Sequence, residues 1–218
     1  MPLDEGGGVR KKRFSFLEPI RTGWGLVKNN PQFFRFQVGY FLCGGGLMLA
    51  MPAIAVLLTK LGFKFTTLFT SNCAAKEMGM ILATPLWGFY MKRNRYELLS
   101  GVVFLFVALF LALLFYLQWG VLVLFGAYFL YGIAQAGSHL LWNLSGPYFS
   151  GEEESSRYTM VNVFMVGLRG SVMPLVGGWL TDAFGSNEAI FFGMMLSLVG
   201  GLVMLRPQPK QKPATALS

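Results

Sequence analysis

Three ionisable residues, Lys76, Glu77 and Arg169, lie inside long apolar stretches of the sequence. Burying such a group in a bilayer costs about 2.5 to 3.5 kcal/mol on insertion scales, so each is a candidate functional residue. Asn72 lies one helical turn before Lys76. We expect Lys76 to line a water-filled cavity and Glu77 to pair with Lys76, with another helix or with a proton. The structural alternative is that the two charges only hold helices together.

Arg169 shares a helical face with Tyr158 and Asn162. A guanidinium near the middle of a membrane needs an anionic partner or water. An ion pair with Glu77 and a substrate anion would each meet this need, and the sequence leaves both open. Asn162 and Arg169 are therefore candidate residues of a substrate or ion pathway.

A stripe of polar and aromatic residues follows one face of another apolar segment. Its members recur at spacings of three and four residues, which places them within about 120° of arc on a helix. Aromatic rings with a few polar tips are typical of small-molecule sites. An interfacial aromatic belt is the alternative, but belts cluster at helix ends and this stripe runs through the middle. The stripe consists of Tyr128, Tyr131, Gln135, Ser138, His139 and Trp142.

The sequence lacks the motifs of soluble catalysis: it has no phosphate-binding loop, no dinucleotide fingerprint and no paired metal ligands. An intramembrane serine protease needs a serine and a histidine facing each other from different helices. The only histidine, His139, directly follows Ser138, so the two side chains point about 100° apart on one helix. Cys43 and Cys73 lie in apolar segments without metal-ligand spacing. We predict that the protein is not an enzyme and uses no cofactor or metal ion.

The composition predicts a membrane protein. Of the 218 residues, 54% are hydrophobic and 13% are charged, whereas soluble domains carry about 25% charged residues. The 21 phenylalanines exceed what one soluble core of this size would bury, because exposed rings promote aggregation. The net charge of +8 does not indicate a nucleic-acid partner, since the basic residues form short clusters between apolar runs. Lipid is the expected solvent.

Six segments are long and apolar enough to cross a membrane, since a spanning helix needs about 20 mostly apolar residues. No stretch alternates like a barrel strand, and only helices or closed barrels satisfy their backbone in lipid. The sequence therefore predicts an all-α membrane protein with a bundle of six transmembrane helices. The expected spans are residues 36–59, 67–91, 97–117, 119–142, 158–181 and 187–205.

Basic residues are distributed unevenly between the two sides of these spans. With the N-terminus inside, fourteen lysines and arginines lie in cytoplasmic segments, whereas only Lys60 and Lys64 lie outside. Cytoplasmic loops carry the excess of basic residues. We therefore expect a multi-pass protein of the plasma or inner membrane with both termini in the cytoplasm.

The two ends of the chain differ from the spans. Residues 1–32 form a basic leader, in which residues 14–30 mix apolar and basic residues as an interfacial helix does. A disordered leader is the alternative for residues 1–13. The proline-rich, charged tail of residues 207–218 is expected to be disordered. The membrane domain would then occupy residues 33–206.

Three segments of the chain carry a family resemblance. They are FLEPIRTGWGLVKNNPQFFRFQVGYFLCGGGLMLAMP, PLWGFYMKRNRYELLSG and RGSVMPLVGGWLTDAFG. The first resembles the end of the central loop and the seventh helix of major facilitator superfamily transporters. The second is similar to the basic loop between the eighth and ninth helices, and the third to the eleventh helix and its exit loop. The resemblance covers residues 14–206.

The second segment resembles a degenerate copy of that family's loop motif of glycine, acidic, basic, glycine and basic residues. Gly88, Arg93 and Arg95 match glycine or basic positions, and the resemblance implies that they belong to a gating loop. Lys92 stands where the family has its acidic residue, and this departure weakens the implied gating role.

The resemblance implies half of a transporter fold. Such transporters have twelve spans in two halves, each made of two inverted three-helix repeats, with the substrate site between the halves. It implies that the first, second, fourth and fifth spans face the cavity and that the third and sixth face lipid. The polarity of the spans agrees, since the third and sixth contain almost no polar residues. The implied function is one half of a secondary transporter, a symporter or antiporter, for a small polar or anionic solute coupled to an ion or proton.

One half alone neither encloses a site nor alternates its access. We therefore expect the chain to pair, within the lipid bilayer, with a separately encoded N-terminal half or with a second copy of itself. The alternative is a truncated remnant or a non-transporting membrane scaffold.

Overall fold

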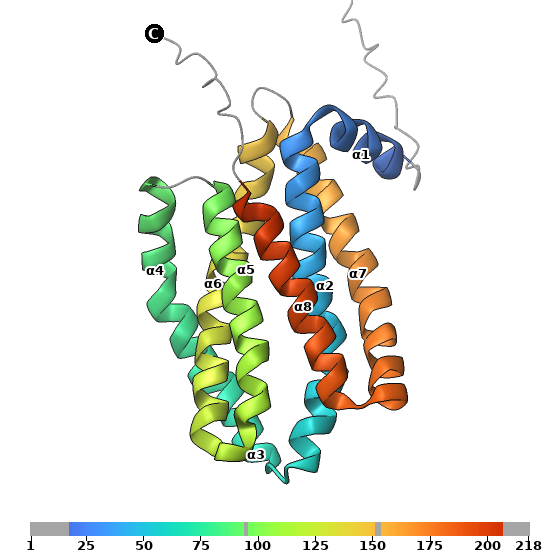
Figure 1. The fold of residues 1–218 in the computed structure, drawn as a ribbon. Coiled ribbons are helices and arrows are strands. Elements are labelled where there is room, and N and C mark those ends of the chain that lie inside the picture. The colour runs from blue at the N-terminus through green and yellow to red at the C-terminus, as the bar shows by residue number, and fades with distance from the viewer. Residues whose placement is uncertain (1–17, 94–95, 151–153, 207–218) are drawn as a thin grey trace, which may run out of the picture.

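A computed structural model describes residues 18–93, 96–150 and 154–206 of the chain. The regular structure in these ranges is entirely helical (Figure 1). The α-helices are α1 (Glu18–Asn29), α2 (Pro31–Lys60), α3 (Phe65–Thr70), α4 (Glu77–Arg93), α5 (Tyr96–Leu113), α6 (Val121–Ser150), α7 (Ser155–Phe184) and α8 (Ser186–Leu205). A π-helix, η1 (Ser71–Lys76), joins α3 to α4, and a 3₁₀-helix, η2 (Leu114–Trp119), extends α5.

Five helical segments in the described ranges are long and apolar enough to cross a membrane: α2, α5 with η2, α6, α7 and α8. They correspond to five of the six predicted spans. The remaining predicted span, residues 67–91, is assembled from α3, η1 and α4, and α4 alone has 17 residues. The all-α membrane bundle is thus confirmed, with the second span interrupted by a π-turn. A π-turn widens a helix locally and is common at functional positions.

Three of the helices are longer than the predicted spans. Helices α2, α6 and α7 have 30 residues each, or about 45 Å at 1.5 Å per residue, against about 30 Å for the hydrocarbon core. The start of α2 shows why. Asn30 caps the helix by accepting a hydrogen bond from the Phe33 amide at 3.0 Å, and Pro31 occupies the first turn. These polar and proline signals lie outside the apolar run that predicts a span.

The chain divides into two successive groups of three spans: α2, α3–η1–α4 and α5 form the first group, and α6, α7 and α8 form the second. Helix α2 packs against α7 and α8, and α6 packs in the corresponding way against α4 and α5. Helices α5 and α8 pack against each other. Exchanging α2, α3–η1–α4 and α5 for α6, α7 and α8 therefore reproduces these principal contacts. Because each group has three spans, the two groups run through the membrane in opposite senses. Figure 1 shows α4 and α7 at opposite edges of the bundle with α2 and α8 between them.

Glycines let α2 and α8 approach closely. A Cβ added at Gly46 would lie closer than 3.0 Å to the carbonyl oxygen of Gly193, and one added at Gly193 would meet the carbonyl oxygen of Gly46. Small residues at such crossings allow backbone contact between membrane helices. The contact between α2 and α8 continues at Gly39 and Gly200, where a Cβ added at Gly200 would lie 2.7 Å from the Gly39 carbonyl oxygen.

The end of α8 is held by a side chain of α2. Arg35 donates hydrogen bonds of 2.5 Å to the carbonyl oxygens of Val203, Met204 and Arg206. The last carbonyls of a helix have no partners within the helix. Arg35 therefore caps α8 and ties its end to the start of α2.

Aromatic packing fills the bundle at the end where α1 lies. The rings of Phe33 and Tyr158 meet edge to face with centroids 4.8 Å apart, and those of Tyr96 and Phe149 with centroids 5.4 Å apart. The Tyr96 hydroxyl donates to the Leu141 carbonyl at 2.6 Å. This cluster packs α2, α5, α6 and α7 together on one side of the membrane midplane.

Helix α1 lies across that end of the bundle (Figure 1). It contacts α7, since a Cβ added at Gly23 would lie 2.9 Å from a methyl group of Val161. A helix was expected within residues 14–30, and α1 falls there; its location at a membrane surface stays a prediction. Residues 1–13, for which a disordered leader was the alternative, and the tail of residues 207–218, which was expected to be disordered, lie outside the described residues.

Candidate functional site

A cavity of about 330 Å³ lies between α2, α5, α6 and α7, with room for roughly ten water molecules. Both three-helix groups contribute walls. Five residues of the predicted stripe on α6 line it, together with the predicted Arg169 of α7. The stripe residues are Tyr131, Gln135, Ser138, His139 and Trp142.

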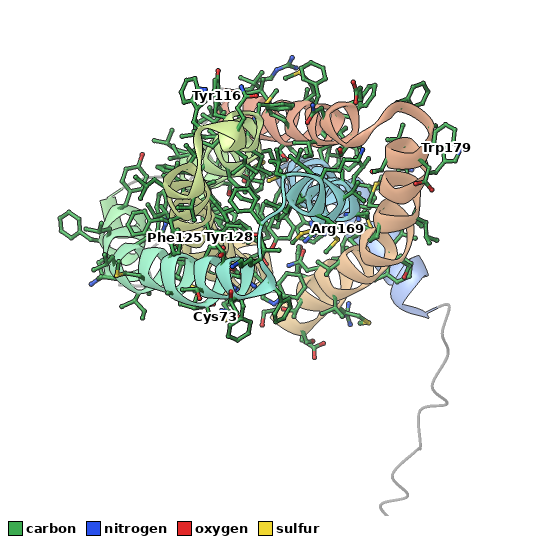
Figure 2. The ribbon with its side chains drawn as sticks, turned by 90° about the horizontal axis from the view of Figure 1, so that it is seen from below. Cys73, Tyr116, Phe125, Tyr128, Arg169 and Trp179 are labelled. Carbon is green, nitrogen blue, oxygen red and sulfur yellow. The ribbon has the colours of Figure 1, made fainter. Side chains whose placement is uncertain are left out.

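Arg169 is the only lysine, arginine, aspartate or glutamate among the residues that line this cavity. Its side chain is buried and lies beside α2 (Figure 2). Nη1 donates a 2.6 Å hydrogen bond to the Tyr40 carbonyl oxygen, and Cζ lies 4.6 Å from the centroid of the Tyr40 ring. Among the described residues no carboxylate pairs with the guanidinium, and Nε has no hydrogen-bond partner. The ion pair with Glu77 that the sequence left open is not formed.

Tyr40 organises the cavity, and sequence reasoning missed it. Besides its contacts with Arg169, its hydroxyl lies 3.3 Å from the Ser138 hydroxyl oxygen. Its ring packs near those of Phe104 and Trp142, with centroids 5.9 Å and 6.3 Å away. One side chain thus connects α2 with α5, α6 and α7. Tyr40 accepts the hydrogen bond of Arg169 through its own backbone carbonyl, which no side-chain pattern reveals.

Gly44 provides the space that the guanidinium occupies. A Cβ at this position would lie 2.8 Å from Nη2 of Arg169 and closer still to Nη1 and Cζ. Gly44 is one turn beyond Tyr40, so the arginine rests on a bare stretch of α2. The sequence does contain a signal for this contact: three consecutive glycines, Gly44 to Gly46, in one span and a single arginine, Arg169, in another.

Gln135 presents a buried amide to the cavity. Its Oε1 is buried without a hydrogen-bond partner in the described part of the chain. Rotation of the amide exchanges Oε1 and Nε2, so either atom is available to a solute. An unpaired polar group of this kind costs about 1 to 3 kcal/mol until a partner arrives.

Tyr128 and Asn162, also predicted site residues, do not line the cavity. The Tyr128 ring packs against Phe110 with centroids 5.8 Å apart, in the apolar cluster at the α3 end of the bundle. Asn162 accepts a hydrogen bond from Gln37 Nε2 and donates one to Ser145 Oγ. This buried network joins α2, α6 and α7. A pathway role for either residue stays a prediction.

Lys76 and Glu77 pair with each other. Lys76 Nζ lies 2.9 Å from Glu77 Oε1, and the two side chains are 17% and 41% exposed. The sequence left several partners open for Glu77, and in the structure its partner is Lys76. Neither residue lines the 330 Å³ cavity. Asn72 is exposed on the same π-turn, and Figure 2 shows its neighbour Cys73 at the edge of the bundle.

The predicted gating loop is only partly described. Gly88 is half-buried in α4, and a Cβ there would meet open space. The Lys92 side chain is exposed. The side chain of Arg93 and the whole of Arg95 lie outside the described residues. The gating role of this loop stays a prediction.

Comparison with known proteins agrees with this architecture. Residues 38–217 match the family model described as Major Facilitator Superfamily. The match includes α2 from its second turn onward and every residue that lines the cavity. A comparison with curated proteins found no match. The family comprises transporters of small solutes. The chain therefore belongs to the Major Facilitator Superfamily and is an integral membrane protein of that transporter class.

Proposed function

We propose that the chain forms the C-terminal half of a secondary transporter for a small polar or anionic solute, coupled to an ion or proton. The membrane domain would occupy residues 33–206, with both termini in the cytoplasm. The observation that carries the proposal is the guanidinium of Arg169, which lines a cavity deep in the bundle without a carboxylate partner among the described residues. A solute anion would supply the missing charge.

The surface of α6 and α7 supports a second half as partner. Of the five long apolar helices in the described ranges, these two are the least apolar and also the least buried. A helix that exposes much of its surface to lipid is expected to be strongly apolar. The exposed faces of α6 and α7 are therefore better suited to a polar cavity and another protein surface. A separately encoded N-terminal half or a second copy of the chain would supply that surface.

The Lys76–Glu77 pair is our candidate for coupling. Its two side chains are partly exposed on the helix that crosses α6 at the π-turn. A proton that neutralises Glu77 would release Lys76 from its 2.9 Å contact. The pair could then respond to the coupling ion while Arg169 holds the solute.

Flux in proteoliposomes tests the proposal. The chain is reconstituted alone and with a co-expressed N-terminal half, and uptake of labelled organic anions is measured under an imposed pH gradient. We expect uptake that Arg169→Gln abolishes, while Tyr116→Phe, an exposed tyrosine of η2 outside the cavity, retains it. Native mass spectrometry of the active sample identifies the partner. Absence of flux in every pairing would refute the proposal and favour a non-transporting scaffold or remnant.

A further inference from the structure

We infer that the solute is a hydroxy acid: a small organic monoanion that carries a hydroxyl group on an apolar, ring-sized body. The inference rests on the proposed function and names the solute class for the same cavity. Three properties of the cavity carry it: one cation without a counter-ion and one amide without a partner among the described residues, and walls that, apart from Cys43, Ser138 and His139, are aromatic or aliphatic.

The charge of the cavity selects a monoanion. Arg169 brings one positive charge, and no aspartate or glutamate of the described residues lines the cavity. Lys76 and Glu77, the charged pair of the second span, lie outside the cavity lining and pair with each other. A monoanion leaves the occupied cavity neutral, whereas a zwitterion leaves the positive charge and a dianion leaves a negative one. An uncompensated charge in a low-dielectric interior is strongly unfavourable.

The geometry of Arg169 favours a group that accepts hydrogen bonds from a guanidinium edge. Nη1 is already engaged by the Tyr40 carbonyl oxygen, and the Tyr40 ring covers one face of the guanidinium. Nε has no partner among the described residues. A carboxylate matches the donors that remain.

Gln135 calls for a second polar group on the solute. Its amide offers one acceptor and two donors, and Oε1 is buried without a partner. A hydroxyl group satisfies such an amide in either orientation, since it both donates and accepts. Ser138 does not fill this need, because Gln135 Oε1 has no hydrogen-bond partner among the described residues, Ser138 included. A site built around a polar group discriminates strongly against an analogue that lacks the matching hydroxyl.

The rest of the cavity accommodates an apolar body. Phe104, Tyr131 and Trp142 present rings to it, and Leu47 and Met48 present aliphatic and thioether surface. A volume of about 330 Å³ is at the lower end of the range for small-molecule sites. These walls fit one ring or short branched chain rather than an extended polar molecule.

Four probes with one common scaffold test the inference: mandelate, phenylacetate, phenylglycine and 1-phenyl-1,2-ethanediol. They carry, respectively, an anion with a hydroxyl, an anion alone, a zwitterion, and hydroxyls without charge. Binding to the full chain in nanodiscs, alone and with the co-expressed N-terminal half, is measured by calorimetry at pH 8. We expect mandelate to bind at least tenfold more tightly than each of the other three.

The variants assign the two polar requirements to their residues. Gln135→Leu should make mandelate and phenylacetate equal in affinity, and Gln135→Asn, which keeps a shorter amide, should restore part of the preference. Arg169→Gln should weaken both acids without weakening the diol. Tyr116→Phe, an exposed tyrosine of η2 outside the cavity, should leave all four affinities unchanged, and thermal unfolding confirms that each variant is folded.

Three results overturn the inference. Equal binding of mandelate and phenylacetate to the native chain, or a preference that survives Gln135→Leu, removes the hydroxyl requirement. If both acids still depend on Arg169, the proposed anion transporter stands without it. Absence of mandelate binding also overturns the inference, and the flux assay then decides the proposed function separately.

Discussion

Three consecutive glycines of α2 should respond to alanine in three different ways. Each replacement of glycine by alanine gains the same intrinsic helix preference, about 0.5 to 1 kcal/mol. Differences between the three variants therefore report only the contacts that the new methyl group makes. At Gly45 it would lie 3.5 Å from Met173, an ordinary contact. At Gly46 it would meet the backbone of α8, and at Gly44 the guanidinium of Arg169.

Gly44→Ala should displace Arg169 while leaving the bundle folded. Ordinary contact requires about 3.4 Å, whereas Nη2 lies 2.8 Å from the added Cβ and Nη1 lies closer, so the guanidinium must retreat by more than half an ångström. The 2.6 Å bond to the Tyr40 carbonyl would then exceed the usual 3.2 Å limit. Hydrogen bonds between membrane helices contribute about 0.6 kcal/mol on average and about 1.7 at most. This loss is small against the helix preference gained, so the effect should be local.

Chemical labelling of arginine, without any ligand, measures this displacement. A dicarbonyl reagent modifies exposed guanidinium groups, and peptide mass spectrometry reports the fraction of Arg169 that reacts. Arg169 is only 7% exposed in the native chain, so we expect several-fold faster modification in Gly44→Ala and no change in Gly45→Ala. Gly46→Ala should instead lower the unfolding temperature, since overpacking against a backbone costs about 1 to 3 kcal/mol.

Two outcomes would refute this reasoning. Identical labelling of Arg169 in Gly44→Ala and Gly45→Ala would mean that the guanidinium does not rest on α2. An unfolding temperature of Gly46→Ala equal to that of Gly45→Ala would mean that α2 and α8 do not meet at these glycines.

Three further predictions concern an ion pair and hydrogen bonds outside the cavity lining. Glu77→Gln should destabilise the chain, and adding Lys76→Gln should recover the loss. Because both side chains are partly exposed, we expect a coupling free energy below about 1 kcal/mol in a double-mutant cycle of unfolding. A much larger coupling would reveal another partner. Asn162→Leu removes the acceptor of the buried Gln37 amide, whereas Ser145 keeps its bond to the Trp142 carbonyl. Calorimetry should show a loss of about 1 to 3 kcal/mol, and adding Gln37→Leu should cost less than Gln37→Leu does alone; strict additivity would contradict the network. Arg35→Gln should accelerate hydrogen exchange in the last turn of α8 but not in the middle of α2; unchanged exchange would contradict the cap.

The fold class and most of the cavity stripe were accessible from the sequence because both depend on local periodicity. Long apolar runs predict spans, and polar residues three and four apart predict one face of α6. Five of those residues indeed line one cavity. Tyr128 does not, because the stripe extends past the cavity into the apolar cluster around Phe110. Periodicity identifies a face of a helix but not how far along that face the cavity reaches.

The partners of the charged residues were not accessible in the same way. Arg169 bonds to a backbone carbonyl of Tyr40, and every residue has such a carbonyl, so no residue type marks it. The π-turn before Glu77 depends on the backbone register of the second span, which side-chain spacing does not record. Glu77 was open to several partners in the sequence, and the adjacent Lys76 proved to be within 2.9 Å.

The packing of the two three-helix groups also constrains how the chain is made. Among these six spans α2 is synthesised first and α8 last, yet the two helices pack against each other. Within each group the helices share fewer contacts than they share with the other group. Neither group can therefore reach its final arrangement while the other is still being synthesised, and contacts this distant in sequence form slowly. Until α8 has been synthesised, the glycine face that α2 presents to α8 lacks its partner helix in the membrane. Truncation before α8 should accordingly leave a chain that inserts but does not fold.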